Sequence, residues 1–149
     1  MSESVPDDIK QAVIERANKC CEYCWSQSRS SSDPLSVEHI VPSSRGGSNK
    51  LDNLASSCQG CNNFKFTAVQ GTDTATGRVV PLYHPRRDSW HDHFAWNEDF
   101  TIIVGKTPVG RATVERLRLN RPGVTNLRTV LGLVGRHSPH QDTIEKDVR

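Results

Sequence analysis

Four cysteines in this sequence form two pairs with the same spacing. They are Cys21, Cys24, Cys58 and Cys61, so each pair reads Cys-x-x-Cys. Two thiolates three positions apart can bind one ion, and two such pairs complete the tetrahedral set of ligands that zinc prefers. Because four cysteines leave no coordination position open, this Zn²⁺ would be structural. The alternative is two unrelated pairs of reactive or buried thiols, and Cys20 is left as the odd thiol.

A second group of chemically capable side chains lies between and just after the cysteine pairs. Glu38 and His39 are adjacent, Asn53 follows, and Asn62 comes directly after the last cysteine. A neutral histidine can take a proton from water near pH 7, and oxygen ligands such as those of Glu38 and Asn62 suit Mg²⁺ or Mn²⁺. Such a set could hydrolyse a phosphodiester. The plainer alternatives are a structural histidine, a surface ion pair for Glu38, and turn or cap roles for the two asparagines.

The elements that must position these groups follow from hydrophobic spacing and from turn residues. The first half reads as a helix over 6–19, a loop over 26–36, a strand over 35–41, a turn over 43–49, and a turn or strand leading into a helix within 50–65. Successive residues of a regular strand point to opposite faces. Glu38 and His39 therefore reach one phosphate only if the hairpin twists or bulges there.

The second half reads as a loop-rich crossing followed by a strand and two helices. The crossing covers 67–89 and the strand covers 100–104. Thr107 and Pro108 form an N-cap and first-turn proline for a helix that runs to about Asn120, where Pro122-Gly123 ends it. A second helix over about 125–135 would place four apolar side chains on one face. These are Leu127, Val130, Leu131 and Val134.

The arginines and histidines of the second half indicate what this part of the chain could bind. Residues 111–136 hold six arginines against Glu115 alone, which suits a polyanion or a solvated helix face. We expect Arg111, Arg116, Arg118 and Arg121 to bind nucleic acid. His91-x-His93 lacks the carboxylate or cysteine that would complete a second metal site, and the aromatic residues around it are expected to pack the extension onto the first half.

The motif order in the first half resembles the HNH endonuclease family. It runs Val-Glu-His-Ile-Val-Pro-x-Ser-x-Gly-Gly, then Leu-Asp-Asn-Leu, then Cys-x-x-Cys-Asn-x-x-Lys, and the likeness covers about residues 16–66. A less specific likeness, from Val80 to Arg121, is to the C-terminal extension of small stand-alone bacterial HNH proteins. The resemblance implies an α+β fold: a ββα-metal core over 1–66, stapled by zinc, and an extension of strand and helices over 67–149 packed on it. Because the tail 138–149 is polar, we expect it to be disordered.

The resemblance also implies roles for individual residues. His39 would be the general base, Glu38 and Asn62 would bind the catalytic Mg²⁺ or Mn²⁺, and Asn53 would hold the loop and orient the histidine. Lys65 stands where a basic residue can meet the phosphate, and its alternative is a solvated helix charge. The family nicks DNA to leave 5′-phosphate and 3′-hydroxyl ends, although RNA is not excluded as a substrate.

Composition argues against membrane-spanning and secreted classes of protein. The chain has 149 residues, 34% of them hydrophobic, and a net charge of +2. No apolar run approaches the ~18 residues of a membrane span, and the acidic N-terminus lacks the pattern of a signal peptide, so we expect a cytoplasmic protein whose thiols stay reduced. We predict a DNA endonuclease, with a zinc-stapled nucleic-acid-binding module that does not cleave as the alternative. The oligomeric state stays open, and a dimer would allow double-strand cleavage.

Overall fold

A computed structural model describes residues 4–137 and has the α+β architecture that the sequence predicts. The helices are α1 (Asp7–Arg16), α2 (Gln59–Lys65), α3 (Trp90–His93), α4 (Pro108–Leu117) and α5 (Pro122–Leu133). The strands are β1 (Ser36–His39), β2 (Leu54–Ser57), β3 (Gln70–Thr72), β4 (Val79–Pro81), β5 (Phe94–Trp96) and β6 (Ile103–Gly105). They form three antiparallel two-stranded sheets, β1–β2, β3–β4 and β5–β6. The predicted disorder of 138–149 falls outside the described residues.

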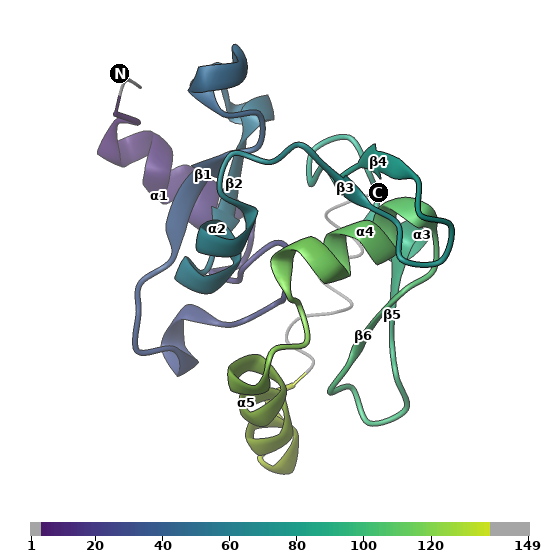
Figure 1. The fold of residues 1–149 in the computed structure, drawn as a ribbon. Helices are drawn as coiled ribbons and strands as arrows, with labels where there is room; N and C mark the ends of the chain where they lie inside the picture. Colours follow the sequence, from purple (N-terminus) through teal and green to yellow (C-terminus); the bar gives the residue numbers. More distant parts are fainter. Residues whose placement is uncertain (1–3, 138–149) are drawn as a thin grey trace.

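The first half of the chain is a hairpin followed by a helix, in the order β1, β2, α2. Pairing in the hairpin is one-to-one, with Glu38 opposite Ala55 and His39 opposite Leu54. Both α1 and α2 pack on this hairpin (Figure 1). Helix α1 stops at Arg16, three residues before the predicted end, because Asn18 and Lys19 both take a positive φ and turn the chain toward the first cysteine pair.

Helix α4 lies at the centre of the second half and contacts α2, α3, β3, β4 and β6 (Figure 1). Its predicted start is confirmed, since the Thr107 hydroxyl accepts a hydrogen bond from the Gly110 amide at 3.0 Å and Pro108 occupies the first turn. The crossing predicted over 67–89 contains the β3–β4 hairpin, whose three-residue strands are too short to show a period-2 pattern.

The strand predicted over 100–104 begins later than expected, at Ile103. The side-chain oxygen of Asn97 accepts from the amides of Thr101 and Ile102 at 2.9 and 3.1 Å, and Phe100 takes a φ of +57°. These residues therefore form the tight turn that joins β5 to β6.

The start and the buried face of α5 also differ from the prediction. Pro122 is the first residue of α5 and does not end α4, which stops at Arg118 in the left-handed region. The buried side chains are Val124, Arg128 and Leu131, while Val130 and Val134 are exposed. The reason is Arg128, whose buried guanidinium donates to the carbonyls of Leu119 and Thr101 and thereby turns its own face of the helix inward.

One hydrophobic cluster joins the two halves. Tyr23, Trp25 and Cys61 of the first half share it with side chains of the second half that include Leu82, Trp90, Phe94, Ala112, Leu117 and Val124. Trp90 packs against Trp25 with ring centroids 5.7 Å apart, and its indole N–H donates to the Tyr23 carbonyl at 3.3 Å. None of the helices within residues 4–137 has both the length and the apolar character needed to cross a bilayer.

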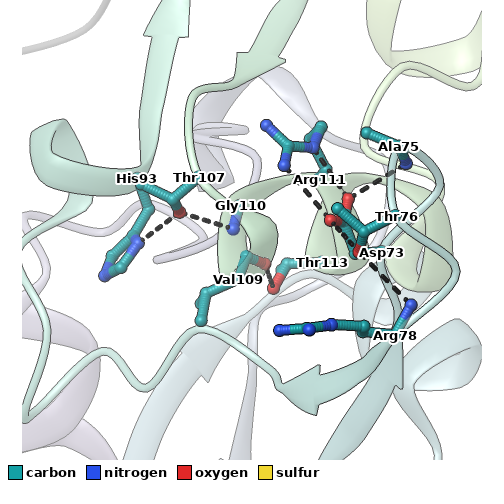
Figure 2. A network of polar contacts seen from close by, with 10 residues as sticks. All are labelled: Asp73, Ala75, Thr76, Arg78, His93, Thr107, Val109, Gly110, Arg111 and Thr113. Carbon is teal, nitrogen blue, oxygen red and sulfur yellow. Dashed lines mark hydrogen bonds and ion pairs between the residues drawn. The ribbon is translucent and has the colours of Figure 1, made fainter.

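An ion pair fastens α4 to the turn between β3 and β4 (Figure 2). Asp73 is fully buried, and its carboxylate accepts two hydrogen bonds from the Arg111 guanidinium, at 2.7 and 3.1 Å. The Thr76 hydroxyl and the Ala75 amide donate to the same carboxylate. Chiefly because of the Arg111 hydrogen bonds, the pKa of Asp73 lies well below its ordinary value.

Because of the ion pair between Asp73 and Arg111, we expect the stability of the protein to depend on pH in the acid range. Because the pKa of Asp73 is lower in the folded than in the unfolded chain, its contribution is present above about pH 4 and is lost as the pH falls through the folded-state pKa. Asp73→Asn should therefore lower the melting temperature at pH 7, and the difference from the wild type should shrink toward about pH 2. Thermal unfolding followed by circular dichroism across this range is the measurement. A difference that stays constant down to about pH 2 would contradict the assignment.

Candidate active site and zinc cluster

The four predicted metal ligands come together in the structure. The sulfur atoms of Cys21, Cys24, Cys58 and Cys61 all lie within 4.8 Å of one another, and the Cys24 and Cys58 sulfurs are 3.6 Å apart. A tetrahedral zinc with Zn–S bonds of ~2.3 Å places its sulfurs about 3.8 Å apart, so the cluster fits this ion. No described histidine or carboxylate belongs to the cluster, which leaves sulfur as the whole donor set within residues 4–137.

Local backbone geometry orients the thiols. The Cys24 amide points at the Cys21 sulfur at 3.5 Å, and the Cys61 amide points at the Cys58 sulfur at 3.4 Å, where Cys58 is the N-cap of α2. Each Cys-x-x-Cys turn therefore directs an amide N–H at its own first sulfur, which favours the thiolate form. Cys20 lies outside the cluster: it is buried, and burial raises the pKa of its thiol to about 11.

Arg121 adds a positive charge beside the cluster, which the sequence did not reveal. Its guanidinium lies 3.3 Å from the Cys58 sulfur and 3.6 Å from the Cys61 sulfur. Burial by itself would lower the pKa of Arg121, but the interactions with the thiols, Cys61 foremost, raise it overall. Gly60 leaves the space for this approach, since a Cβ there would lie 2.6 Å from the guanidinium. Four thiolates around a Zn²⁺ ion would carry a net charge of −2, which Arg121 would partly neutralise.

This contact predicts that Arg121 supports metal affinity. Removing an outer partner of a metal ligand typically costs 10–100-fold in affinity, so Arg121→Gln should weaken zinc binding by about that factor. Competition with a chromophoric chelator measures it. Arg118→Gln is the matched control, because Arg118 is exposed and stacks over Phe64 without a contact to the sulfurs. Equal zinc affinity in the two variants would contradict the role given to Arg121.

The cavity beside the hairpin brings together three of the four predicted catalytic residues, without Asn53. It has a volume of about 450 Å³ and is lined by Glu38, His39 and Asn62, with Val37, Pro42, Ser43, Ser44, Phe66 and Thr67 completing the wall. Strand β1 ends at His39, so the histidine stands where the hairpin opens into its turn. Although the pairing is regular, both neighbouring residues line this cavity.

His39 is held by one polar contact. Its Nε2 lies 2.5 Å from the side-chain oxygen of Asn49, in the turn after β1. An amide oxygen can only accept, so Nε2 is the donor in this contact, and in the neutral imidazole Nδ1 then has the lone pair. This contact of Asn49 with His39 was not predicted from the sequence, where its signal was the place of Asn49 in the Gly-Gly turn between the strands.

Asn53 stabilises the same turn with three side-chain hydrogen bonds. Its amide group accepts from the Val41 N–H at 2.9 Å and donates to the carbonyls of Val41 and Ser48 at 2.9 and 2.8 Å. Gly47 permits this closure, because a Cβ there would lie 1.6 Å from the Val41 carbonyl oxygen. These three hydrogen bonds agree with the predicted role of Asn53 in holding the loop. That Asn53 also orients His39 through this loop stays a prediction.

Glu38 is buried and has two protein partners. Its carboxylate accepts a hydrogen bond from the Tyr23 hydroxyl and forms an ion pair with Lys65, whose Nζ lies 3.4 Å from Oε2. Burial raises the pKa of Glu38, and Lys65 opposes that shift. A carboxylate offers about four acceptor positions, so these two contacts do not use all of them. Tyr23, the second x of the first cysteine pair, was also missed by the sequence analysis.

Lys65 is placed differently from both sequence expectations, the phosphate contact and the solvated charge. Its side chain is buried, and Nζ donates to the Ile40 carbonyl at 2.9 Å as well as pairing with Glu38. A buried ammonium is tolerated only with such partners. Lys65 therefore positions the Glu38 carboxylate. Asn62, one turn earlier on α2, is half-buried on the cavity wall, and within residues 4–137 its side chain has no hydrogen-bond partner.

The four predicted nucleic-acid arginines fall into two groups. Arg111 and Arg121 are partly buried and are engaged by other protein groups, with Asp73 and with the cysteine sulfurs respectively. Arg116 and Arg118 are exposed at the C-terminal end of α4, and Arg116 lies 3.5 Å from the Lys65 carbonyl. The exposed pair therefore lies on the side of α4 that faces the end of α2.

Comparison with known proteins agrees with this geometry. The family model for HNH endonuclease matches residues 21–66, and this segment is an HNH endonuclease domain with a hairpin, a helix and four clustered cysteines. The chain is also similar to the Septu protein PtuB of Bacillus thuringiensis, with 29% identity over 115 residues. This similarity covers 76% of the present chain and 41% of the relative, so the chain spans less than half of that protein's length. No solved structure matches.

Proposed function

We propose that this chain is a metal-dependent endonuclease that hydrolyses DNA phosphodiester bonds by nicking. The observation that carries the proposal is the single cavity on which Glu38, His39 and Asn62 meet. An HNH domain supports a nuclease-type function with a nucleic-acid substrate. The proposal adds that DNA is the substrate and that one strand is cut at each visit, since one chain offers one such cavity among its described residues.

In this proposal His39 is the general base. Nδ1 carries the free lone pair while Asn49 holds the opposite ring nitrogen, so the ring can take a proton from a water without changing its orientation. The proton taken by Nδ1 leaves an imidazolium whose Nε2–H still donates to Asn49. The deprotonated water attacks the phosphorus and the P–O3′ bond breaks. The leaving O3′ takes a proton from a solvent water and becomes the 3′-hydroxyl, and the phosphate stays on the other product as a 5′-phosphate.

Glu38 and Asn62 would hold the catalytic divalent cation. A carboxylate and a neutral amide are hard oxygen donors that suit Mg²⁺ or Mn²⁺, and two protein ligands leave positions for substrate and water. When bound, such a cation stabilises the negative charge that develops on the phosphate and the leaving oxygen. Tyr23 and Lys65 hold the Glu38 carboxylate in place, which fixes one ligand before the cation arrives.

Nicking of supercoiled plasmid tests the function. After weakly bound divalent ions are removed on a chelating resin, the protein should convert plasmid to the open circle only when Mg²⁺ or Mn²⁺ is added. DNA ligase should reseal the product, because it requires 5′-phosphate and 3′-hydroxyl ends. A protein that retains zinc and binds the plasmid but never nicks it would be the non-cleaving nucleic-acid-binding module.

We expect the two exposed arginines at the C-terminal end of α4 to contribute to DNA affinity. Each phosphate contact contributes about one to the slope of log affinity against log salt concentration. Replacing Arg116 and Arg118 by Gln should therefore weaken DNA binding and reduce that slope by up to about two. Fluorescence anisotropy over a series of salt concentrations measures both quantities. An unchanged affinity and slope would show that these arginines do not contact phosphates.

A further inference from the structure

Phe66 stands out among the residues that line the catalytic cavity. It follows directly after α2, and 72% of its surface is exposed, although a phenylalanine gains stability from burial. The same cavity wall contains His39 and Asn62, so the ring lies at the site where the proposed chemistry takes place. Val37 and Pro42 give the wall a further apolar surface.

The backbone holds Phe66 in a conformation that large side chains rarely adopt. Its φ is +51° and its ψ is −123°, and a strained conformation of this kind costs about 1–3 kcal/mol. Hydrogen bonds keep it there: the Phe66 amide donates to the Asn62 carbonyl at 2.9 Å, and the Ala68 amide donates to the Lys65 carbonyl at 2.9 Å.

The residues on both sides are also fixed. Lys65 is buried against Glu38, and the Arg45 guanidinium donates to the Thr67 carbonyl at 2.8 Å. The exposed ring therefore stands on a fixed backbone. The strained backbone of Phe66 and the exposure of its ring to solvent both cost free energy in the free protein. A ligand that covers the ring would offset the cost of the exposure.

Aromatic rings beside a nucleic-acid site bind nucleobases by stacking, with little preference for the base. In an intact duplex both faces of a base are covered by its neighbours, so a ring must pay to unstack them, whereas an unpaired or extruded base offers a face to Phe66 without that cost. We propose that Phe66 stacks on a nucleobase next to the scissile phosphate, and that the nuclease therefore prefers DNA with an unpaired nucleotide at the cleavage position. This inference rests on the proposed endonuclease function.

A binding experiment tests the stacking without requiring cleavage. His39→Ala protein is mixed with a single-stranded oligonucleotide that carries 2-aminopurine, whose fluorescence changes when it stacks on a ring. Phe66→Leu in this background should abolish the fluorescence change and weaken binding by about 5- to 150-fold, the range measured for one stacked base. Phe66→Trp should retain both.

Phe100→Leu is the matched control, because Phe100 is also exposed, at 46%, and also has a positive φ, but does not line the cavity. It should bind like the parent protein. Equal binding by the Phe66→Leu and Phe100→Leu proteins would overturn the stacking proposal, as would tighter binding to an intact duplex than to the single strand.

A cleavage experiment tests the substrate preference. Wild-type protein should cleave a duplex with a one-nucleotide gap or bulge with a higher kcat/KM than the same duplex without it, and Phe66→Leu should bring the ratio close to one. A wild-type ratio of one would overturn the preference. If the wild type cleaves neither substrate, the proposed endonuclease function fails, whereas the fluorescence experiment still decides whether Phe66 stacks.

Discussion

Withdrawal of zinc from the four-cysteine cluster should unfold the half of the chain that holds the candidate active site. Structural zinc in small domains contributes about 10–16 kcal/mol to folding, whereas a whole domain is stable by only about 5–15 kcal/mol. The cluster joins the turn after α1 to the start of α2, and three of its cysteines belong to the main hydrophobic cluster. Little else in a chain with 34% hydrophobic residues could replace this contribution.

The measurement is circular dichroism and melting temperature during titration with a strong chelator, followed by addition of zinc. We expect loss of the cooperative transition and its recovery with one equivalent of zinc. Cys58→Ser should behave like the chelated protein. Cys20→Ser is the control: this cysteine is buried but outside the cluster, so the variant should keep one zinc and lose only about 1–3 kcal/mol. A chelated protein that melts like the untreated one would disprove the structural role of the metal.

Replacement of His39 by alanine should produce the largest loss of activity. General base catalysis by a positioned side chain contributes about 10²–10⁴-fold, and on the described cavity wall His39 is the residue with a free ring nitrogen. Its ring is half-buried at the end of β1 and its contact is with a turn residue, so the fold should tolerate its removal.

Single-turnover cleavage of a labelled oligonucleotide, with affinity measured separately, distinguishes loss of chemistry from loss of binding. His39→Ala should bind DNA and zinc like the wild type and cleave at least about 100-fold more slowly. His91→Ala, a histidine of α3 away from the cavity, should cleave like the wild type. A His39→Ala protein that fails to bind DNA would point to a structural role for this side chain.

Local signals in the sequence were sufficient for the cysteine cluster, for β1 and for the start of α4. The Cys-x-x-Cys spacing indicated the cluster, the alternation around Val37 indicated β1, and Thr107 with Pro108 marked the start of α4. Each of these depends on residues a few positions apart, where the geometry of a turn, strand or cap fixes the outcome.

The partners of charged side chains could not be predicted in the same way. Lys65 pairs with Glu38 across 27 positions, Arg111 with Asp73 across 38, and Arg121 approaches Cys58 across 63. A run of arginines reads as a surface for polyanions, but whether each one faces solvent depends on which buried acceptor lies beneath it. Arg128 shows the same effect, since its buried hydrogen bonds decided which face of α5 turned inward.

We propose that three residues lining the cavity, Glu38, His39 and Asn62, hydrolyse DNA with His39 as the general base. The most direct test is the initial rate of supercoiled plasmid nicking in Mg²⁺ or Mn²⁺ by wild-type and His39→Ala proteins purified in parallel. We expect open circular product with the wild type and a rate lower by about two orders of magnitude or more with the variant. Equal nicking by the two proteins would contradict it.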